Sequence, residues 1–213
     1  MSVFKIKEEH PPIIGLTISS KTKMTSNNNS ITYFSLGEGT DISSEAYPNT
    51  QIYIVNGGEG KFVLDGKSVF VKEGDIIVVK GGTLCGSSTE HGFVYTEVIP
   101  NKEVEMNQIV KASEVFKLAD LLPYQKDSIV NADIVSNDTM KFVIMAFDEG
   151  TGLTPHAAPG NAIVFALEGK ATIGYEEKEY QIEAGEQFHF AKGGMHSVTA
   201  NGQFKMALLL VLE

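Results

Sequence analysis

Two histidines are candidates for ligand binding in this sequence, because each lies next to the end of a predicted strand. His156 precedes a short apolar run in "LTPHAAPGNAIVFALEGK" (153–170), and His196 follows the Gly pair of "AKGGMHS" (191–197). Neutral imidazole is a common ligand for Zn, Fe, Ni or Cu, and it also forms hydrogen bonds with polar ligands. Three interpretations stay open for this pair: a metal site, a metal-free polar pocket, or a structural remnant.

Two further side chains are candidates near these histidines. His189 alternates with Phe188 and Phe190, so it takes the opposite face of the predicted strand, and the sequence does not tell which face meets a cavity. Asn161 offers an amide oxygen, a poor ligand for a transition metal but a good hydrogen-bond partner for a hydroxyl or carboxylate. We therefore predict substrate binding by His156, Asn161 and His196, and metal binding by His156, His196 and His189. No catalytic residue is assigned.

Composition and charge exclude several classes of function. The formal net charge is −10 and no run of Lys and Arg occurs, which argues against binding to nucleic acid or an anionic membrane. No segment reaches the roughly 18 apolar residues of a membrane helix, and "MSVFKIKEEHPP" lacks the features of a signal peptide. With the single Cys85, no disulfide can form within the chain, so we expect a reducing, cytoplasmic setting. The expected partner is a small molecule.

An internal repeat organises the chain. A shift of 111 residues brings "EGTDI" (38–42) onto "EGTGL" (149–153), and the same shift superimposes several Gly, Pro, Lys and Phe positions over more than fifty residues. At a shift of 112, "VFKI" (3–6) also meets "VFKL" (115–118). A fixed offset of this kind indicates a duplicated module. We predict two domains, 1–108 and 109–213.

Each half shows the pattern of an all-β fold. Apolar and β-branched residues occur in short runs separated by turn signals such as "NGGEG", "LDGK", "KEGD" and "YEEKE". Hairpins are predicted in "KFVLDGKSVFV" (61–71) and "KATIGYEEKEYQI" (170–182). The segment 113–125 has helical spacing and predicts a short helix or a turn, and the polar stretch 19–30 predicts a surface loop.

The Gly-bounded strand pairs of the C-terminal half resemble the two motifs of the cupin superfamily. Gly150 is followed by His156 and Gly169 at the spacing of the first motif, and Gly185, Gly193 and His196 fit the second. The resemblance implies two tandem cupin jelly-roll barrels in one all-β chain, an RmlC-like bicupin. In such a barrel the two motif strands are neighbours, so the imidazoles of His156 and His196 would point into one cavity.

Departures from the cupin motifs limit what the resemblance implies. Ala158 and Ala162 replace the second His and the Glu of the first motif, while Ala191 and Ala200 replace the Pro and Asn of the second. The corresponding N-terminal positions hold no histidine and are occupied by Glu45, Tyr47, Gln51 and Cys85. Glu45, Gln51 and Cys85 together would be an unusually mixed and partly neutral ligand set. We therefore interpret the N-terminal barrel as a support that has lost its metal ligands.

The C-terminal half is more similar to a group of small cupins that share a "FxLADLxxYQ" segment, as in "FKLADLLPYQ" (116–125). That group reads Asp where this chain has Asn161, and it implies no settled activity. The superfamily resemblance implies a divalent transition metal (Zn, Fe, Ni or Mn), or none, and an oxygenase, isomerase or lyase acting on a small polar substrate. The alternative is a metal-free ligand-binding or sensor protein. Near-continuous apolar strands also suggest a homodimer.

Overall fold

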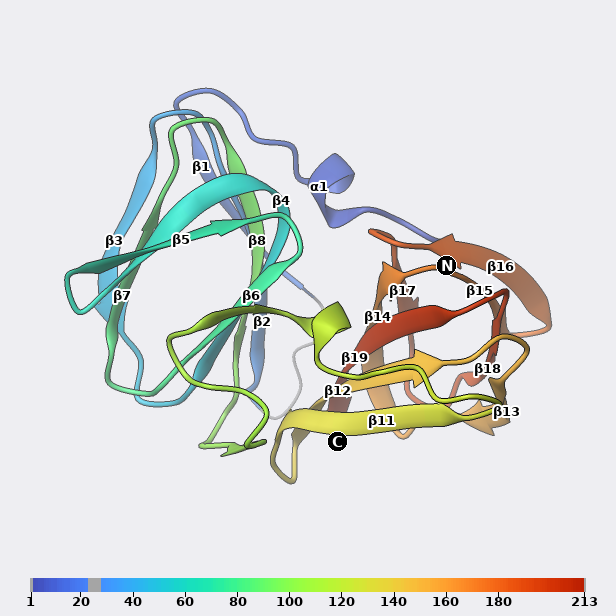
Figure 1. Cartoon of the computed structure of the whole chain (residues 1–213). Coiled ribbons are helices and arrows are strands. Elements are labelled where there is room, and N and C mark those ends of the chain that lie inside the picture. Colours follow the sequence, from blue (N-terminus) through green and yellow to red (C-terminus); the bar gives the residue numbers. More distant parts are fainter. Residues whose placement is uncertain (1, 23–27, 213) are drawn as a thin grey trace. The chain divides into compact units, whose positions relative to one another are not determined.

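The computed structural model describes residues 2–22 and 28–212, which divide into two compact units (Figure 1). The N-terminal unit comprises Ile6–Val104 and Val110–Lys117. The C-terminal unit comprises Glu105–Ile109 together with the described residues of 1–5 and 118–213. Nearly all of the regular secondary structure in both units is antiparallel strand, so the prediction of an all-β fold with two jelly-roll halves is confirmed.

The N-terminal unit contains one short helix, α1 (Ile6–Glu9), and two sheets that share a long strand. One sheet runs in the order β1-β2-β8-β4-β6-β10, and in the other β7 lies between β3 and β4, with β5 also paired to β4. A bulge between Val55 and Gly57 lets β4 pass from the first sheet into the second. The bounds are β1 (Thr17–Lys21), β2 (Ser30–Leu36), β3 (Asp41–Ala46), β4 (Gln51–Leu64), β5 (Lys67–Lys72), β6 (Asp75–Val79), β7 (Leu84–Ser88), β8 (Phe93–Ile99) and β10 (Val115–Lys117).

The C-terminal unit has two sheets, in the orders β17-β14-β19-β12-β11-β9 and β13-β18-β15-β16. Their inward-facing side chains form an apolar core that includes Phe147, Phe188, Phe190 and Phe204. The bounds are β9 (Glu105–Met106), the 3-10 turn η1 (Leu118–Asp120), β11 (Ile129–Ser136), β12 (Met140–Phe147), β13 (Gly152–Ala157), β14 (Gly160–Glu168), β15 (Lys170–Tyr175), β16 (Lys178–Glu183), β17 (Gln187–Phe190), β18 (Met195–Ala200) and β19 (Phe204–Leu212).

The predicted repeat recurs in the strands. β3, β5, β7 and β8 begin at residues 41, 67, 84 and 93, and β13, β16, β18 and β19 begin 111 residues later, at 152, 178, 195 and 204. Both predicted hairpins are present, with positive φ at Asp65 and Gly66 in one turn and at Glu176 and Glu177 in the other. Two consecutive positive φ angles are typical of a type I′ turn, which suits the twist of a two-residue hairpin.

Near the predicted boundary at 108, consecutive short segments of the chain belong alternately to the two units. β9 pairs with β11 in the C-terminal unit, whereas β10, further along the chain, pairs with β6 in the N-terminal unit. Phe4 forms a bridge with Gln187 and so belongs to the C-terminal unit. The two units are therefore not separated by a single cut. The segment 113–125 forms β10 and the η1 turn, with no α-helix among its residues.

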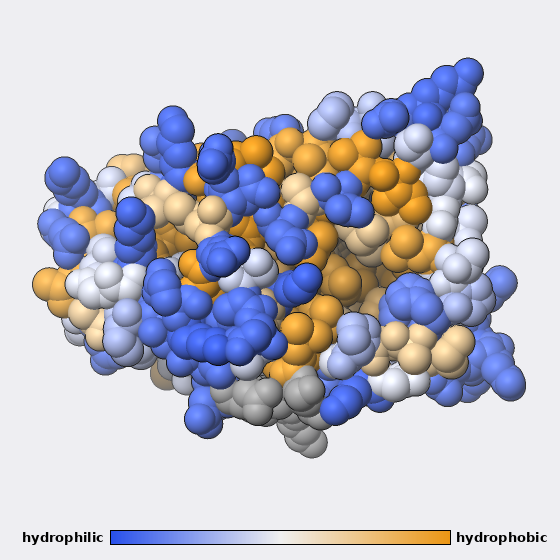
Figure 2. Space-filling view, turned by 90° about the horizontal axis from the view of Figure 1, so that it is seen from below, coloured by the Kyte–Doolittle hydropathy of each residue, from blue (hydrophilic) through white to orange (hydrophobic). Residues whose placement is uncertain are grey.

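Both ends of the loop expected at 19–30 belong to strands in the structure. β1 extends to Lys21 and β2 begins at Ser30, and residues 23–27 of the expected loop lie outside the described residues. Among the residues that are described, no helix is long and apolar enough to cross a membrane. On the face drawn in Figure 2, hydrophilic residues are interspersed with hydrophobic ones.

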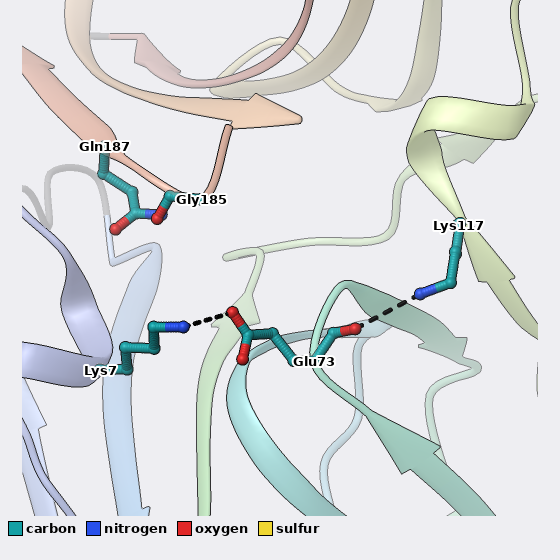
Figure 3. A network of polar contacts seen from close by, with 5 residues as sticks. All are labelled: Lys7, Glu73, Lys117, Gly185 and Gln187. Atoms are coloured by element: carbon teal, nitrogen blue, oxygen red, sulfur yellow. Dashed lines mark hydrogen bonds and ion pairs between the residues drawn. The ribbon is translucent and has the colours of Figure 1, made fainter. Parts of the chain in front are cut away.

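A glycine turn before one strand of each unit is held by side-chain contacts (Figure 3). In the N-terminal unit, Lys7 Nζ donates to the Glu73 carboxylate (2.6 Å) and Lys117 Nζ donates to the Glu73 carbonyl oxygen (3.3 Å). In the C-terminal unit, Gln187 Nε2 donates to the carbonyl oxygen of Gly185 (3.0 Å). The Lys7–Glu73 ion pair is partly exposed, so we expect its contribution to be at most about 1 kcal/mol.

Candidate functional site

His156 and His196 form a cross-strand pair in the C-terminal unit. β13 and β18 are antiparallel neighbours, and their register places His156 directly opposite His196. The ring centroids lie 4.1 Å apart, with 52° between the ring planes. His156 is exposed, whereas only 7% of His196 is exposed. The structure therefore brings together the two histidines that are 40 positions apart in the sequence.

Backbone carbonyl groups fix the tautomer of both rings. Nδ1 of His156 lies 2.8 Å from the carbonyl oxygen of Thr154, and Nδ1 of His196 lies 3.2 Å from the carbonyl oxygen of Gly194. A carbonyl oxygen can only accept a hydrogen bond, so each Nδ1 must carry the proton and donate it. In a neutral ring, Nε2 then keeps a free lone pair. An imidazole held in this way is ready to bind a metal ion or to accept a hydrogen bond.

Aromatic side chains surround His196 on the inner face of the barrel. Phe190 stacks on its ring at a centroid distance of 4.1 Å and an interplanar angle of 28°. Tyr175 is its cross-strand partner on β15. Burial in this setting lowers the pKa of His196, the hydrogen bond to Gly194 raises it in part, and the neighbouring His156 lowers it further. The site thus favours a neutral His196.

Alanines occupy the positions where cupins carry further ligands. Ala158 and Ala162 are 4% and 2% exposed and belong to the apolar core, and Ala162 pairs with Phe190 across β14 and β17. Their methyl groups supply no donor atom. Among residues 2–22 and 28–212, no group of three or more His, Cys, Asp or Glu side chains could hold a metal ion. The donor set fits an ion held by two imidazoles and not the facial triad, which needs a carboxylate.

His189 is not brought to this pair. Phe188 and Phe190 face the core, so His189 points to the other face of β17. There it contacts Phe4 edge to face, with ring centroids 4.7 Å apart. Its Nε2 is buried and has no hydrogen-bond partner among the described residues, and burial lowers the pKa of the ring. The side chain is packed as a neutral aromatic ring.

Asn161 also lies on the face of its strand that is turned from the core. Ala162 and Val164 of β14 point into the core cluster, so the alternation turns Asn161 the other way. Its Oδ1 accepts a hydrogen bond from the backbone nitrogen of Lys192 (3.2 Å). This contact links the start of β14 to the turn after β17, and it engages the amide oxygen that was predicted to bind substrate.

A polar cavity in the N-terminal unit was missed by the sequence interpretation. It has a volume of about 180 Å³ and is lined by residues of β2, β3, β4, β7 and β8, including Glu45, Tyr53, Cys85 and Glu97. This half lacks the histidine ligands of a cupin, and for that reason the sequence predicted only a supporting role for it. The signal was nevertheless present in the strand "FVYTEVI" (93–99), where alternation places Phe93, Tyr95 and Glu97 on one face.

The comparisons with known proteins agree with this fold. Residues 143–212 match the family model described as "Cupin domain", which spans most of the C-terminal unit. No curated protein sequence matches the chain. Residues 143–212 thus carry a cupin domain, and the predicted resemblance to the cupin superfamily is confirmed.

Solved structures with this fold cover nearly the whole chain. A "Cupin 2 conserved barrel domain protein" from Leptotrichia buccalis is 23% identical, with a TM-score of 0.87, over 99% of this chain and 96% of that one. Salicylate 1,2-dioxygenase from Pseudaminobacter salicylatoxidans is 12% identical, with a TM-score of 0.66, over 98% and 83%. AerE from Microcystis aeruginosa is 16% identical, with a TM-score of 0.53, over 92% and 98%. At these identities the likeness concerns the fold alone.

Proposed function

We propose that the C-terminal unit binds a divalent transition metal ion through Nε2 of His156 and Nε2 of His196, and that a small polar molecule binds at the same place. One observation carries this proposal: both Nδ1 atoms donate to backbone carbonyl groups, so facing rings present two free Nε2 lone pairs. Zn, Fe, Ni and Mn are the candidate ions, and imidazole favours the first three. A bound ion would supply Lewis-acid chemistry for an oxygenase, isomerase or lyase.

The chain's own residues have defined tasks in this proposal. The Thr154 and Gly194 carbonyl groups orient the two rings, and Phe190 excludes water from one face of His196. The exposed His156 is the first of the pair that an incoming ion or ligand meets. The free cysteine, Cys85, is buried and fits a reducing compartment such as the cytoplasm.

Metal content tests this proposal directly. The protein is stripped with a chelator, dialysed against Zn²⁺ or Co²⁺, desalted and analysed for bound metal. We expect wild type to retain close to one ion and the His156→Ala, His196→Ala double variant to retain none. His189→Ala is the matched control and should retain the ion, because His189 faces away from the pair. Equal metal content in wild type and the double variant would refute metal binding by the pair.

A metal-free function is the second candidate, and the alanines at positions 158 and 162 favour it. With two protein donors only, the pair can instead bind the hydroxyl or acid group of a small ligand through its Nε2 atoms. The protein would then act as a binding or sensor protein. Metal-free wild type should in that case show NMR shift changes with small hydroxy acids such as lactate, and the double variant should show none.

A further inference from the structure

The N-terminal cavity combines aromatic walls with a buried carboxyl group. Tyr53, Phe62 and Tyr95 are buried and lie close together, with ring centroids 4.5 Å apart for Tyr53 and Phe62 and 5.2 Å apart for Phe62 and Tyr95. Phe34 stacks on Tyr95 at 5.1 Å. Glu97 follows Tyr95 on the same face of β8, is directly opposite Tyr53 and is 8% exposed.

Among the described residues that line the cavity, no cation balances this carboxyl group. The residues that line the cavity include Glu45 and Glu97 but no Lys, Arg or His. In the part of the chain that the structure describes, no ion pair to Glu97 is formed, and the groups that affect its titration are Tyr53 and Glu45. A buried carboxyl group without a cation is costly in its charged form, so it holds a proton until a cationic partner stabilises the carboxylate. The cavity therefore calls for a ligand that brings a positive charge.

The tyrosine hydroxyl groups of the cavity already have partners, which leaves the ring faces for a ligand. Tyr95 shares a hydrogen bond with Ser87 (2.9 Å), Tyr53 donates to Gln51 Oε1 (2.9 Å), and Tyr47 donates to Glu45 Oε2 (3.0 Å). The faces of such rings carry negative electrostatic potential and attract cations within about 6 Å. Aromatic walls and an unbalanced carboxyl group thus favour the same kind of ligand.

We propose that the N-terminal unit binds a small organic cation, an alkylammonium ion, in this cavity, with Glu97 as its counter-ion and the rings of Tyr53 and Tyr95 beside its alkyl groups. The volume of about 180 Å³ corresponds to about six water molecules at roughly 30 Å³ each, so the ligand is small. The exposed Glu45 and the half-buried Tyr47 lie at the solvent side of the lining, where the ligand enters. This site is independent of the histidine pair.

The protonation of Glu97 makes the binding depend on pH. Burial raises the pKa of Glu97 to about 7, the nearby Tyr53 hydroxyl group lowers it in part, and Glu45 raises it. The other titratable groups of the lining are Tyr47, Tyr53, Cys85 and Tyr95; burial raises the pKa of each, to about 12 for Tyr47 and about 11 for Cys85. These four stay neutral between pH 5 and pH 9, so Glu97 governs the change in this range.

Three probes of nearly equal shape test the sign of the charge: tert-butylammonium, tert-butanol and pivalate. Binding is followed by NMR shift changes of the full-length protein at pH 8.5 and pH 5.5. We expect tert-butylammonium to bind at least tenfold more tightly than tert-butanol at pH 8.5, and pivalate not to bind. At pH 5.5 the affinity for tert-butylammonium should fall by up to roughly 30-fold, because Glu97 with a pKa of about 7 is then mostly protonated.

Two variants distinguish the effect of the Glu97 charge on binding from the effect of the protein's net negative charge. Glu97→Gln keeps the shape of the side chain and should lower the affinity for tert-butylammonium at pH 8.5 at least tenfold and remove most of its pH dependence. Glu38→Gln removes one exposed charge outside the lining and should leave both unchanged. The NMR spectrum of each variant shows whether it is folded. Equal binding of tert-butanol and tert-butylammonium, tighter binding of pivalate, or no binding of any probe would overturn the proposal.

Discussion

Phe190 lies against His196 in the C-terminal unit, with ring centroids 4.1 Å apart and 28° between their planes. The same ring is 3% exposed and contacts Tyr175 and Phe188. One aromatic side chain therefore fills the core and supports the histidine pair at once. A cavity at this position would loosen both.

Replacement of Phe190 by Ala should lower the free energy of unfolding by about 3–5 kcal/mol, the usual cost of removing a buried aromatic ring. The measurement is guanidinium unfolding followed by circular dichroism. The control is Phe70→Ala, because Phe70 is 76% exposed and its loss should change stability by no more than about 0.5 kcal/mol. Similar costs for the two variants would contradict the buried position of Phe190.

Alanine substitutions at two glycines with positive φ, Gly169 and Gly185, distinguish the cost of steric overlap from the cost of backbone strain. Gly169 has a φ of 75°, and a Cβ atom there would overlap the carbonyl oxygen of Gln203. Gly185 has a φ of 87°, with open space around a Cβ atom. Gly185→Ala should therefore cost about 1–2 kcal/mol for the left-handed conformation alone. Gly169→Ala should cost a further 1–3 kcal/mol or so from overpacking, and thermal unfolding of both variants tests the difference.

Stability should respond to pH through Glu97. Its pKa of about 7 in the folded protein lies above the ordinary value of 4.5, so the folded state holds the proton more tightly than the unfolded state. The stabilisation linked to this proton is full below pH 4.5 and is lost as the pH rises through about 7. Glu97→Gln removes the effect. From pH 4.5 to pH 8.5, unfolding free energies should shift in favour of the variant by on the order of 3 kcal/mol.

The control for this pH effect is Glu38→Gln, whose stability should follow that of wild type at every pH. Chemical unfolding in the same buffers gives both curves. Parallel curves for wild type and Glu97→Gln would show that Glu97 titrates normally, and that the cavity does not isolate it from water.

Strand β10 should decide how well the N-terminal unit folds in isolation. Val115 and Phe116 of β10 pair with Ile77 and Ile76 of β6, and Lys117 forms an ion pair with Asp75 (3.0 Å). A fragment spanning residues 6–117 keeps these contacts, whereas a fragment spanning 6–108 leaves β6 with an unpaired edge. We expect the longer fragment to melt at a higher temperature and to scatter less light. A shorter fragment of equal stability would be the opposite result.

Fold and repeat could be predicted because they depend on patterns that many residues share. The 111-residue offset appears in glycines and turn residues, and the same offset separates strands such as β5 and β16. The juxtaposition of His156 and His196 depended on the resemblance to cupins, since nothing local relates residues 40 positions apart. The assignment of β9 and β10 to different units could not be predicted, because strands of two or three residues are too short to show alternation in the sequence.

Side-chain orientation accounts for what the sequence did not reveal about the sites. Alternation placed His189 opposite Phe188 and Phe190, but it cannot say which face is inside, and the structure turns the phenylalanines inward. Asn161 was judged by its amide chemistry, whereas its strand neighbour Ala162 shows that it faces away from the core. Glu97 was missed because the N-terminal half was assessed by its absent histidines and not by the polar groups on its inward-facing positions.

The duplicated register makes one barrel a template for the other. Glu45 stands opposite Cys85 across β3 and β7, in the same relation that His156 has to His196 across β13 and β18. Converting both residues to histidine would therefore graft a second imidazole pair onto strands that already hold the required spacing. The repeated register thus offers a second place in the same chain where a histidine pair can be built without a change of the backbone.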